Sequence, residues 1–362
     1  MLYRIVKEYS DFGAHRTGTD VDNATQGWFA SHLHARGAEV SRQEYPFEFF
    51  VGRTRVTLDG CEIPSMPLYY EYAGSVKTDK VAIAEFGDGE HGSGLDEALE
   101  KTIDSATNSG FDALVIATRG ETGDLVAINC EPELRDRIPV ILVPGRYADA
   151  LATGKTSIEY HAQTEPRVSA NLTGHWPGRD SGPPFVITTP LSGWFNCAGE
   201  RGTGIAVALQ VAESLADRLP HIPLQVIAPS GHELGFHGAW RVAETINAPP
   251  RAVLHLGSCI AARDAQLQGV VHADPSTSEA ISKALAPIDV IPARPANHLD
   301  PGCWIGESQC WAAFGIPMLS IAGVSPLFHT PRDTAEAATT PELLRDAAEC
   351  VTKAALALAK DR

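Results

Sequence analysis

The chain has 362 residues, of which 44% are hydrophobic and 20% charged, and its formal net charge is −16. This composition is that of a folded globular protein, and the length favours two domains over one. The acidic balance argues against nucleic acid or an anionic membrane as a partner, because both need basic patches. No apolar run of about 18 residues is present to span a bilayer, and the N-terminus lacks a signal-peptide core. Seven Cys without a paired CxxC spacing predict reduced thiols, so we expect a cytoplasmic protein.

The first 167 residues divide into two parts with different patterns of predicted helices and strands. Residues 1–50 have the pattern helix, turn, helix, strand, and the amphipathic helix over 24–36 is ended by Gly37. From about 55 to 167, short β-type runs and one helix over 95–106 are separated by Gly and Pro. This second part predicts a smaller, β-rich domain inserted into the chain.

From Val168 onward, strand patterns alternate with helix patterns. Strands are predicted over 185–189, 224–228, 252–256 and 317–322, and helices over 204–219, 238–246, 276–286 and from 341 to the C-terminus. Ser276 opens one helix as a capping box, and Thr340 caps the last helix. The alternation predicts an α/β fold with a mixed, mainly parallel sheet and helices on both faces. We therefore expect residues 1–54 and 168–362 to form one domain around the insert 55–167.

The segment Ser230–Gly238 is a strand-to-helix turn that carries His232, Glu233 and His237. Open α/β sheets bind their ligands at such turns. The spacing His-Glu-x-x-x-His is one residue longer than the helical zinc motif, so it does not indicate that motif. Two interpretations remain open from this stretch alone: a functional site, or a polar turn that caps the next helix.

Four segments in chain order resemble the family-28 metallopeptidases, which include zinc aminopeptidases and glutaminyl cyclase. They are Arg16–Thr19, Cys197–Gly204, Ser230–Gly238 and Phe328–Thr334. The last of them, Phe-His-Thr-Pro-Arg-Asp-Thr, is close to the family's final His-Thr-x-x-Asp-Thr signature and is the most specific match. The resemblance covers nearly the whole chain and implies the zinc-aminopeptidase-like fold, with the insert as a protease-associated domain.

The resemblance also implies where metal ligands would lie. The typical family site binds two zinc ions through two His, two Asp and a Glu, and a second Glu is the general base. Thr189 and Gly257 stand where ligands of one zinc would be, so that ion has lost its own protein ligands. Glu200, Glu233 and His329 would hold the other, and this set with an open fourth position suits a single catalytic zinc. The alternative is a relative that has lost its metal and kept these side chains for hydrogen bonding.

His232 stands where the family has its carboxylate base, as the resemblance implies. An imidazole with a pKa of about 6.5 can take a proton from water and return it to a leaving group. We therefore assign His232 as the catalytic residue. An imidazole is less able than a carboxylate to hold water against a cationic substrate amine, which argues against a simple aminopeptidase.

Other side chains are expected to contact the substrate. They are Arg201, Trp194, His255, Trp304 and Phe328. His255 lies two residues before Gly257 on one strand, so both face the same side, although a strand His is often a core residue. The loop positions of the aromatic residues favour an apolar pocket, with core packing as the alternative. Arg201 either binds a substrate carboxylate or pairs with an acid.

The sequence predicts a hydrolase or acyl-transfer enzyme that acts on an amide, N-acyl or peptide-like small molecule and uses one zinc ion. Two alternatives remain open. One is a metal-free lyase, cyclase or isomerase with His232 and His329 as proton carriers. The other is a non-catalytic peptidase homologue. Metal content separates the first prediction from both alternatives.

Overall fold

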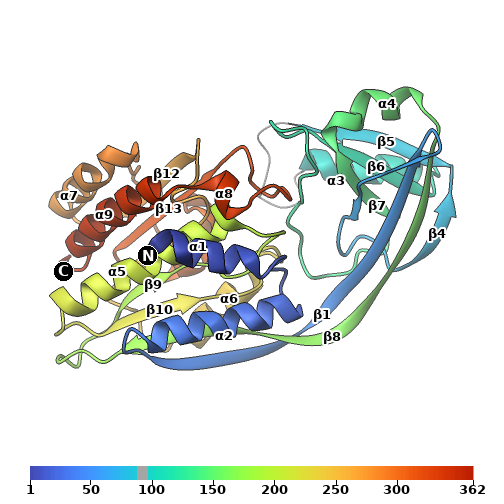
Figure 1. The fold of residues 1–362 in the computed structure, drawn as a ribbon. Helices are drawn as coiled ribbons and strands as arrows, with labels where there is room; N and C mark the ends of the chain where they lie inside the picture. Colours follow the sequence, from blue (N-terminus) through green and yellow to red (C-terminus); the bar gives the residue numbers. More distant parts are fainter. Residues whose placement is uncertain (88–96, 362) are drawn as a thin grey trace.

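Two lobes joined by a long two-stranded ribbon make up the computed structural model, which describes residues 1–87 and 97–361 (Figure 1). The ribbon consists of β1 (Glu39–Leu58) and β8 (Thr156–Trp176), which pair antiparallel along their whole length. The domain boundaries predicted at 54/55 and 167/168 fall inside these two strands, so the backbone passes from one lobe into the other without a break.

The larger lobe is built on most of a nine-stranded sheet with the order β12-β13-β11-β9-β10-β8-β1-β2. The far end of this sheet, where β2 pairs with β1 and β4 pairs with β8, lies in the smaller lobe (Figure 1). The four central strands are parallel: β13 (Met318–Val324), β11 (Ala252–Leu256), β9 (Phe185–Thr188) and β10 (Leu224–Ala228). The outer strands are antiparallel to their neighbours and include β12 (Gln266–His272), β2 (Cys61–Ile63) and β4 (Gly74–Thr78). The predicted mixed sheet is therefore confirmed, with its parallel pairs in the middle.

Helices cover both faces of the parallel strands. One face carries α1 (Leu2–Asp11), α2 (Asp20–His34), α5 (Thr203–Arg218), α7 (Pro275–Leu285) and α9 (Pro341–Leu358) (Figure 1). The other carries α6 (His237–Thr245) and the 3₁₀ segment η5 (Gly306–Phe314). Ile187 and Val226 pack into the first core, whereas their neighbours Val186 and Ile227 pack into the second. Burial on both sides explains why these strands are continuous apolar runs in the sequence.

Shorter helical turns complete the larger lobe. They are the π-type turn η2 (Ala198–Gly202), the 3₁₀ turns η3 (Ala286–Ile288) and η4 (Pro301–Cys303), and α8 (Ala335–Ala338). Thr340 caps α9 as predicted, because its side chain accepts the N–H of Leu343. The capping box predicted at Ser276 is wrong: Asp274 is the N-cap residue of α7, and Pro275 occupies the first helical position.

The smaller lobe has its own sheet and core. Its strand order is β3 (Met66–Pro67), β7 (Val140–Pro144), β6 (Ala113–Thr118) and β5 (Val81–Phe86), with α3 (Glu97–Asn108), η1 (Gly145–Tyr147) and α4 (Ala148–Thr153) beside it. Ile103 of α3 packs with Leu114 and Leu142 in this core. The helix predicted over 95–106 is found in α3, and its first two predicted residues lie outside the described part of the chain. The identification of this lobe as a protease-associated domain stays a prediction.

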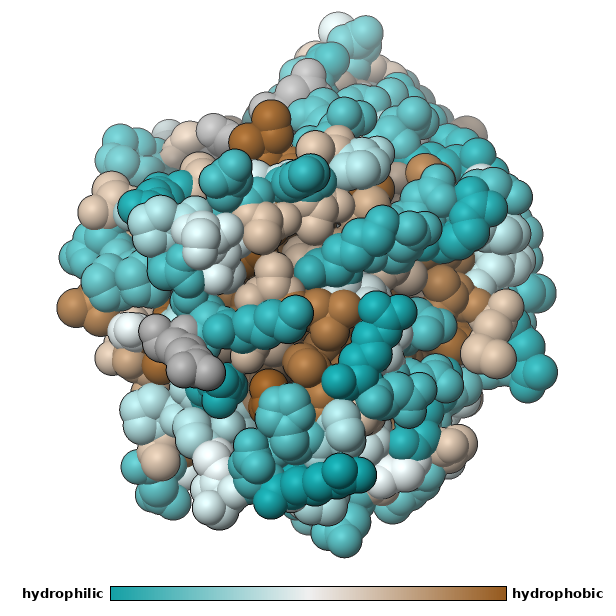
Figure 2. Space-filling model, turned by 90° about the vertical axis from the view of Figure 1, so that its left-hand side faces the viewer, coloured by the Kyte–Doolittle hydropathy of each residue, from teal (hydrophilic) through white to brown (hydrophobic). Residues whose placement is uncertain are grey.

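Hydrophilic side chains cover much of the face of the molecule drawn in Figure 2. On the face drawn in Figure 2, hydrophobic side chains form patches among hydrophilic ones, around a hollow near the middle. Among the helices of residues 1–87 and 97–361, none is long and apolar enough to cross a membrane. Most large apolar side chains are instead packed in the cores of the two lobes.

Gly238, at the start of α6, is predicted to tolerate no side chain. A Cβ there would lie 1.9 Å from the carbonyl oxygen of Ser230 and 2.4 Å from Oδ1 of Asn171. Gly238→Ala should lower the free energy of unfolding by about 3 kcal/mol, because backbone must move to admit the methyl group. Urea denaturation measures this change. Gly27→Ala is the control: Gly27 has open space in the middle of α2, and alanine should stabilise the protein by about 0.5–1 kcal/mol.

Candidate active site

The candidate site lies where the parallel strands β9, β10 and β11 end and their loops begin, the usual ligand position in an open α/β sheet. Several non-glycine residues in these loops and in the loop after β13 have a left-handed backbone. They are Phe195, Cys197, Phe236, Cys259 and His329, with φ between 43° and 62°. Such conformations cost free energy and tend to cluster at functional sites, where the surrounding structure holds them.

His232 is held in the site by a carboxyl group that the sequence did not indicate. Its Nδ1 lies 3.0 Å from Oε1 of Glu307, and its backbone N–H donates to Oγ of Ser192 at 3.1 Å. Glu307 is fully buried in η5, 75 residues further along the chain. Burial raises the pKa of Glu307 to about 8. Burial, together with the charges of Arg201 and His329, holds the pKa of His232 well below its usual range.

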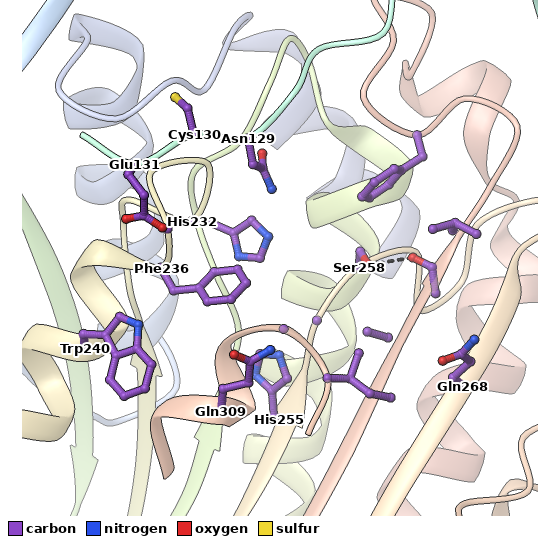
Figure 3. Close-up of a pocket in the computed structure, with 18 of the residues that line it drawn as sticks. Asn129, Cys130, Glu131, His232, Phe236, Trp240, His255, Ser258, Gln268 and Gln309 are labelled. Carbon is purple, nitrogen blue, oxygen red and sulfur yellow. Dashed lines mark hydrogen bonds between the residues drawn. The ribbon is translucent and has the colours of Figure 1, made fainter. Parts of the chain in front are cut away.

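A cavity of about 600 Å³ lies in front of His232, a volume that suits a small ligand. The ring of His232 points into this cavity, with Asn129 and His255 on either side of it (Figure 3). The lining combines aromatic rings, carboxamides and one carboxylate, contributed by Phe236, Trp240, Phe328, Gln266, Gln268, Gln309 and Glu131. Asn129, Cys130, Glu131 and Arg135 come from the smaller lobe, so both lobes form the cavity wall. Sequence reasoning did not single out these four residues.

His255 lines the same cavity, and its contact with substrate stays a prediction. The side chain is fully buried on β11, and neither ring nitrogen has a hydrogen-bond partner among the described residues. Burial lowers its pKa to about 3, so the ring is uncharged at neutral pH. Its Nε2 is 3.1 Å from the point that a Cβ at Gly257 would occupy, and 3.7 Å from the corresponding point at Gly306. The two glycines therefore leave space beside an unpaired imidazole.

Glu200, Arg201 and His329 form a buried charged cluster beside the cavity. Nη2 of Arg201 lies 2.6 Å from Oε1 of Glu200, and Nε2 of His329 lies 3.1 Å from the same oxygen. These are ion-pair contacts rather than well-aligned hydrogen bonds. Burial alone would raise the pKa of Glu200, but Arg201 and His329 together outweigh it, so the pKa is lowered. Arg201 is fully buried and does not line the cavity, so its predicted contact with substrate is wrong. The alternative, pairing with an acid, is what the structure has.

Both carboxylate oxygens of Glu233 accept hydrogen bonds from uncharged donors. The backbone N–H of Thr17 donates to its Oε1 at 2.6 Å, and the hydroxyl of Ser192 donates to its Oε2 at 2.8 Å. Glu200, in turn, faces a guanidinium. Over residues 1–87 and 97–361, no group of three or more His, Cys, Asp or Glu side chains is arranged to hold a metal ion. The structure thus does not bring Glu200, Glu233 and His329 together as the predicted single-zinc site, because each carboxylate has another partner.

An extended segment of the smaller lobe, residues 125–131, closes over the site; we call it the strap. Its Ala127 N–H donates to the carbonyl of His329 at 2.9 Å, and the Ala127 carbonyl accepts Nδ1 of His329 at 2.9 Å. The N–H of Cys130 donates to the carbonyl of Glu233 at 3.0 Å. These bonds join the strap to two of the loops that carry the site, so the smaller lobe takes part in shaping it.

The aromatic residues predicted to contact substrate have different positions. Phe328 lines the cavity and stacks on the ring of His329, with ring centroids 4.0 Å apart. Trp194 is buried, and its Nε1 donates to Oδ1 of Asn129 in the strap at 2.8 Å. Trp304 is buried in the second core, and its Nε1 donates to the carbonyl of His298. Trp194 and Trp304 therefore do not reach the cavity, and core packing, the alternative, explains them.

The fold and the position of the site define an α/β protein of the zinc-aminopeptidase-like architecture. The model of peptidase family M28 matches residues 160–355, more than half of the chain. The chain therefore belongs to peptidase family M28. A comparison with curated proteins found no match.

Solved structures agree with this assignment of the fold. A zinc aminopeptidase from Bacillus subtilis is similar with a TM-score of 0.74 and 17% identity, over 98% of this chain and 93% of that chain. A peptidase M28 precursor from Shewanella amazonensis SB2B has a TM-score of 0.77 and 18% identity, over 99% of this chain and 92% of that chain. A glutaminyl cyclase from Porphyromonas gingivalis has a TM-score of 0.53 and 12% identity, over 98% and 96%. At sequence identities of 12–18%, the structural similarity shows the fold alone.

Ser192, which sequence reasoning missed, is predicted to stabilise the site. Its hydroxyl oxygen accepts the backbone N–H groups of Gly231 and His232, and the hydroxyl donates to Glu233. Ser192→Ala leaves these buried groups without their partner and should cost about 1–3 kcal/mol of unfolding free energy. The control Ser31→Ala removes an exposed hydroxyl in α2 and should change it by less than about 0.5 kcal/mol. Equal values for the two variants in urea denaturation would contradict this role of Ser192.

Proposed function

We propose that this chain is a hydrolase that cleaves an amide bond of a small peptide-like molecule held in the cavity between the two lobes. The observation that carries the proposal is the His232–Glu307 pair, with the imidazole on the cavity wall and its Nδ1 3.0 Å from a buried carboxyl group. A carboxylate on one ring nitrogen fixes the tautomer and directs the other nitrogen toward the reacting atoms. Membership of peptidase family M28 supports the choice of an amide as the scissile bond.

In the proposed reaction, Nε2 of His232 accepts a proton from a water molecule while the water oxygen attacks the carbonyl carbon. The carbon–nitrogen bond then breaks, and His232 returns the proton to the departing nitrogen. The products are a carboxylic acid and an amine, and the protein ends as it began. General acid–base catalysis by one positioned side chain contributes about 10²- to 10⁴-fold to the rate.

His255 is proposed to bind the substrate. Its ring is uncharged and has no hydrogen-bond partner in the part of the chain that the structure describes. An N–H of the ring can therefore donate to the carbonyl oxygen as negative charge develops there. The carboxamides of Gln266, Gln268 and Gln309 offer both donors and acceptors, which suits peptide groups. The rings of Phe236 and Phe328 give the cavity apolar walls for a side chain.

Zinc chemistry is not part of this proposal. The names of some structural relatives include zinc, and the sequence analysis expected one ion at Glu200, Glu233 and His329. These residues do not fit that role, because Arg201 lies against Glu200 and uncharged donors occupy both oxygens of Glu233. His329 as a proton carrier, an alternative from the sequence, is disfavoured because its ring is buried and both nitrogens face acceptor oxygens.

His232→Ala should abolish turnover and leave the fold intact, since the side chain sits at the cavity wall. The measurement is release of p-nitroaniline from a panel of aminoacyl and N-acyl-aminoacyl anilides, with folding checked by circular dichroism. The wild type should cleave at least one compound, and His232→Ala should lose about 10²-fold or more of kcat/KM. His237→Ala, on the same turn but outside the cavity lining, is the control and should retain the wild-type rate.

If the wild type cleaves no member of the panel, amide hydrolysis is the wrong reaction class for this cavity. If His232→Ala and His237→Ala cleave equally well, His232 has no part in the mechanism.

The rate should increase with pH around an apparent pKa of about 8, the value to which burial raises Glu307. Below it, the protonated Glu307 donates to Nδ1 of His232, so the ring proton is on Nε2 and that nitrogen cannot act as a base. Above it, the carboxylate accepts the Nδ1 proton and leaves Nε2 free. The measurement is kcat/KM against pH, and Glu307→Gln should remove the inflection because an amide does not titrate. A Glu307→Gln variant that keeps the inflection would assign it to another group.

A further inference from the structure

Arg201 is one of the largest fully buried side chains of the described chain, and it carries a positive charge. It follows Glu200 in the π-type turn that leads into α5. Its Nε donates to the carbonyl of Ser192 at 3.1 Å, and its Nη2 lies 2.6 Å from Oε1 of Glu200. Burying a cation carries a large desolvation penalty, so a buried cation must be compensated by an opposite charge and by hydrogen bonds.

We propose that the guanidinium of Arg201 takes the place of a metal ion in this member of peptidase family M28. It is a fixed organic cation that neutralises Glu200 and joins the turn of Glu200 to the loop of Ser192. The inference concerns cation content and is independent of the reaction proposed for the cavity.

The arrangement of charges supports this inference. A metal ion at Glu200 would lie a few ångströms from the guanidinium, and two cations at that distance repel strongly in a buried site. The remaining donors do not offset this repulsion. Glu233 has a hydrogen bond on each oxygen, and His329 donates through Nδ1 to the carbonyl of Ala127 in the strap. The site thus already contains its positive charge.

The packing around Arg201 also fits a guanidinium. Gly193 lies beside it, and a Cβ at Gly193 would be 3.4 Å from Nε of Arg201 and 3.0 Å from Sγ of Cys197. A glycine thus leaves room for the arginine side chain to lie inside the turn. Asp333 accepts the backbone N–H groups of Gly199 and Glu200 at 2.7 and 3.0 Å, which fixes the turn from the other side.

The first test is the cation content of the full-length wild-type chain, purified without chelators. Elemental analysis after dialysis against zinc chloride and gel filtration should find only a small fraction of one zinc ion per chain. The thermal midpoint should not shift in excess zinc chloride, because only a ligand that binds the native state raises it. Close to one retained zinc ion per chain would overturn the proposal.

The second test removes the buried positive charge. Arg201→Ala leaves the buried Glu200 carboxylate with His329 but without its permanently charged partner, and it should lower the thermal midpoint by about 10 °C. Zinc chloride or methylguanidinium chloride should restore about half of that loss, since either cation can enter the vacated space. The double variant Glu200→Gln/Arg201→Ala has no buried charge to neutralise, so its midpoint should be higher and should not respond to either cation.

Two further variants are controls for the loss of the Arg201 charge. Arg201→Lys retains the charge and should stay folded and zinc-free, even if Arg201→Ala does not fold. Arg4→Ala removes an exposed arginine that pairs with Glu8, and neither its midpoint nor its zinc response should differ from the wild type. If the midpoint of Arg201→Ala matches that of Arg4→Ala, or if zinc stabilises wild type and Arg201→Lys as much as Arg201→Ala, the guanidinium does not replace a metal ion.

Discussion

A buried carboxylate needs a counter-charge, and in this chain Arg201 supplies it to Glu200. The rest of the site depends on this pair. Glu200 also contacts Nε2 of His329, whose Nδ1 meets the carbonyl of Ala127 in the strap. Glu200 and His329 thereby connect the turn η2, the loop before α8 and the smaller lobe. Removing either charge would leave the other buried alone, which is far more costly than removing both.

The long ribbon explains how a lobe inserted in the middle of the chain can reach the site. β1 and β8 pair over their full length and run from the sheet of the larger lobe to the smaller one. Beyond the ribbon, the chain returns through the strap, whose backbone bonds to His329 and Glu233. The smaller lobe is therefore a wall of the cavity, because Asn129 and Glu131 face it beside His232 (Figure 3).

The central strands were predictable from the sequence, whereas the ribbon and β12 were not. Residues 224–228 and 252–256 are short apolar runs between Pro or Gly residues, and the structure has strands with the same bounds. The ribbon alternates buried and exposed residues over 20 positions and contains Pro46 and Pro166, so its pattern indicates several short strands. β12 contains Gln266, Gln268 and Gly269 and forms the edge of the sheet, where an apolar run is not required.

The pairings within the site were harder to predict than its residues. The resemblance placed Glu200, His232, Glu233 and His329 in one region, and the structure agrees that the loops carrying them meet. The sequence gives no sign that His232 pairs with Glu307, because a contact across 75 residues has no local pattern. Nor does it predict that Arg201 turns back on its neighbour Glu200. In a regular α-helix adjacent side chains diverge, and here a π-type turn brings them together.

The acidic side chains of the site and His255 differ in how many of their polar atoms have a hydrogen-bond or ion-pair partner. Glu233 and Asp333 accept hydrogen bonds at both carboxylate oxygens, and Arg201 neutralises Glu200, so these residues have the environment of a structural core. His255 has no hydrogen-bond partner within the described residues, although it is fully buried. Burying an unpaired polar group costs free energy, and folding tolerates it where a ligand or water supplies the missing partner. The chemistry of this molecule is therefore expected on the side of His255 and His232, and a structural role is expected for the cluster of Glu200, Arg201 and His329.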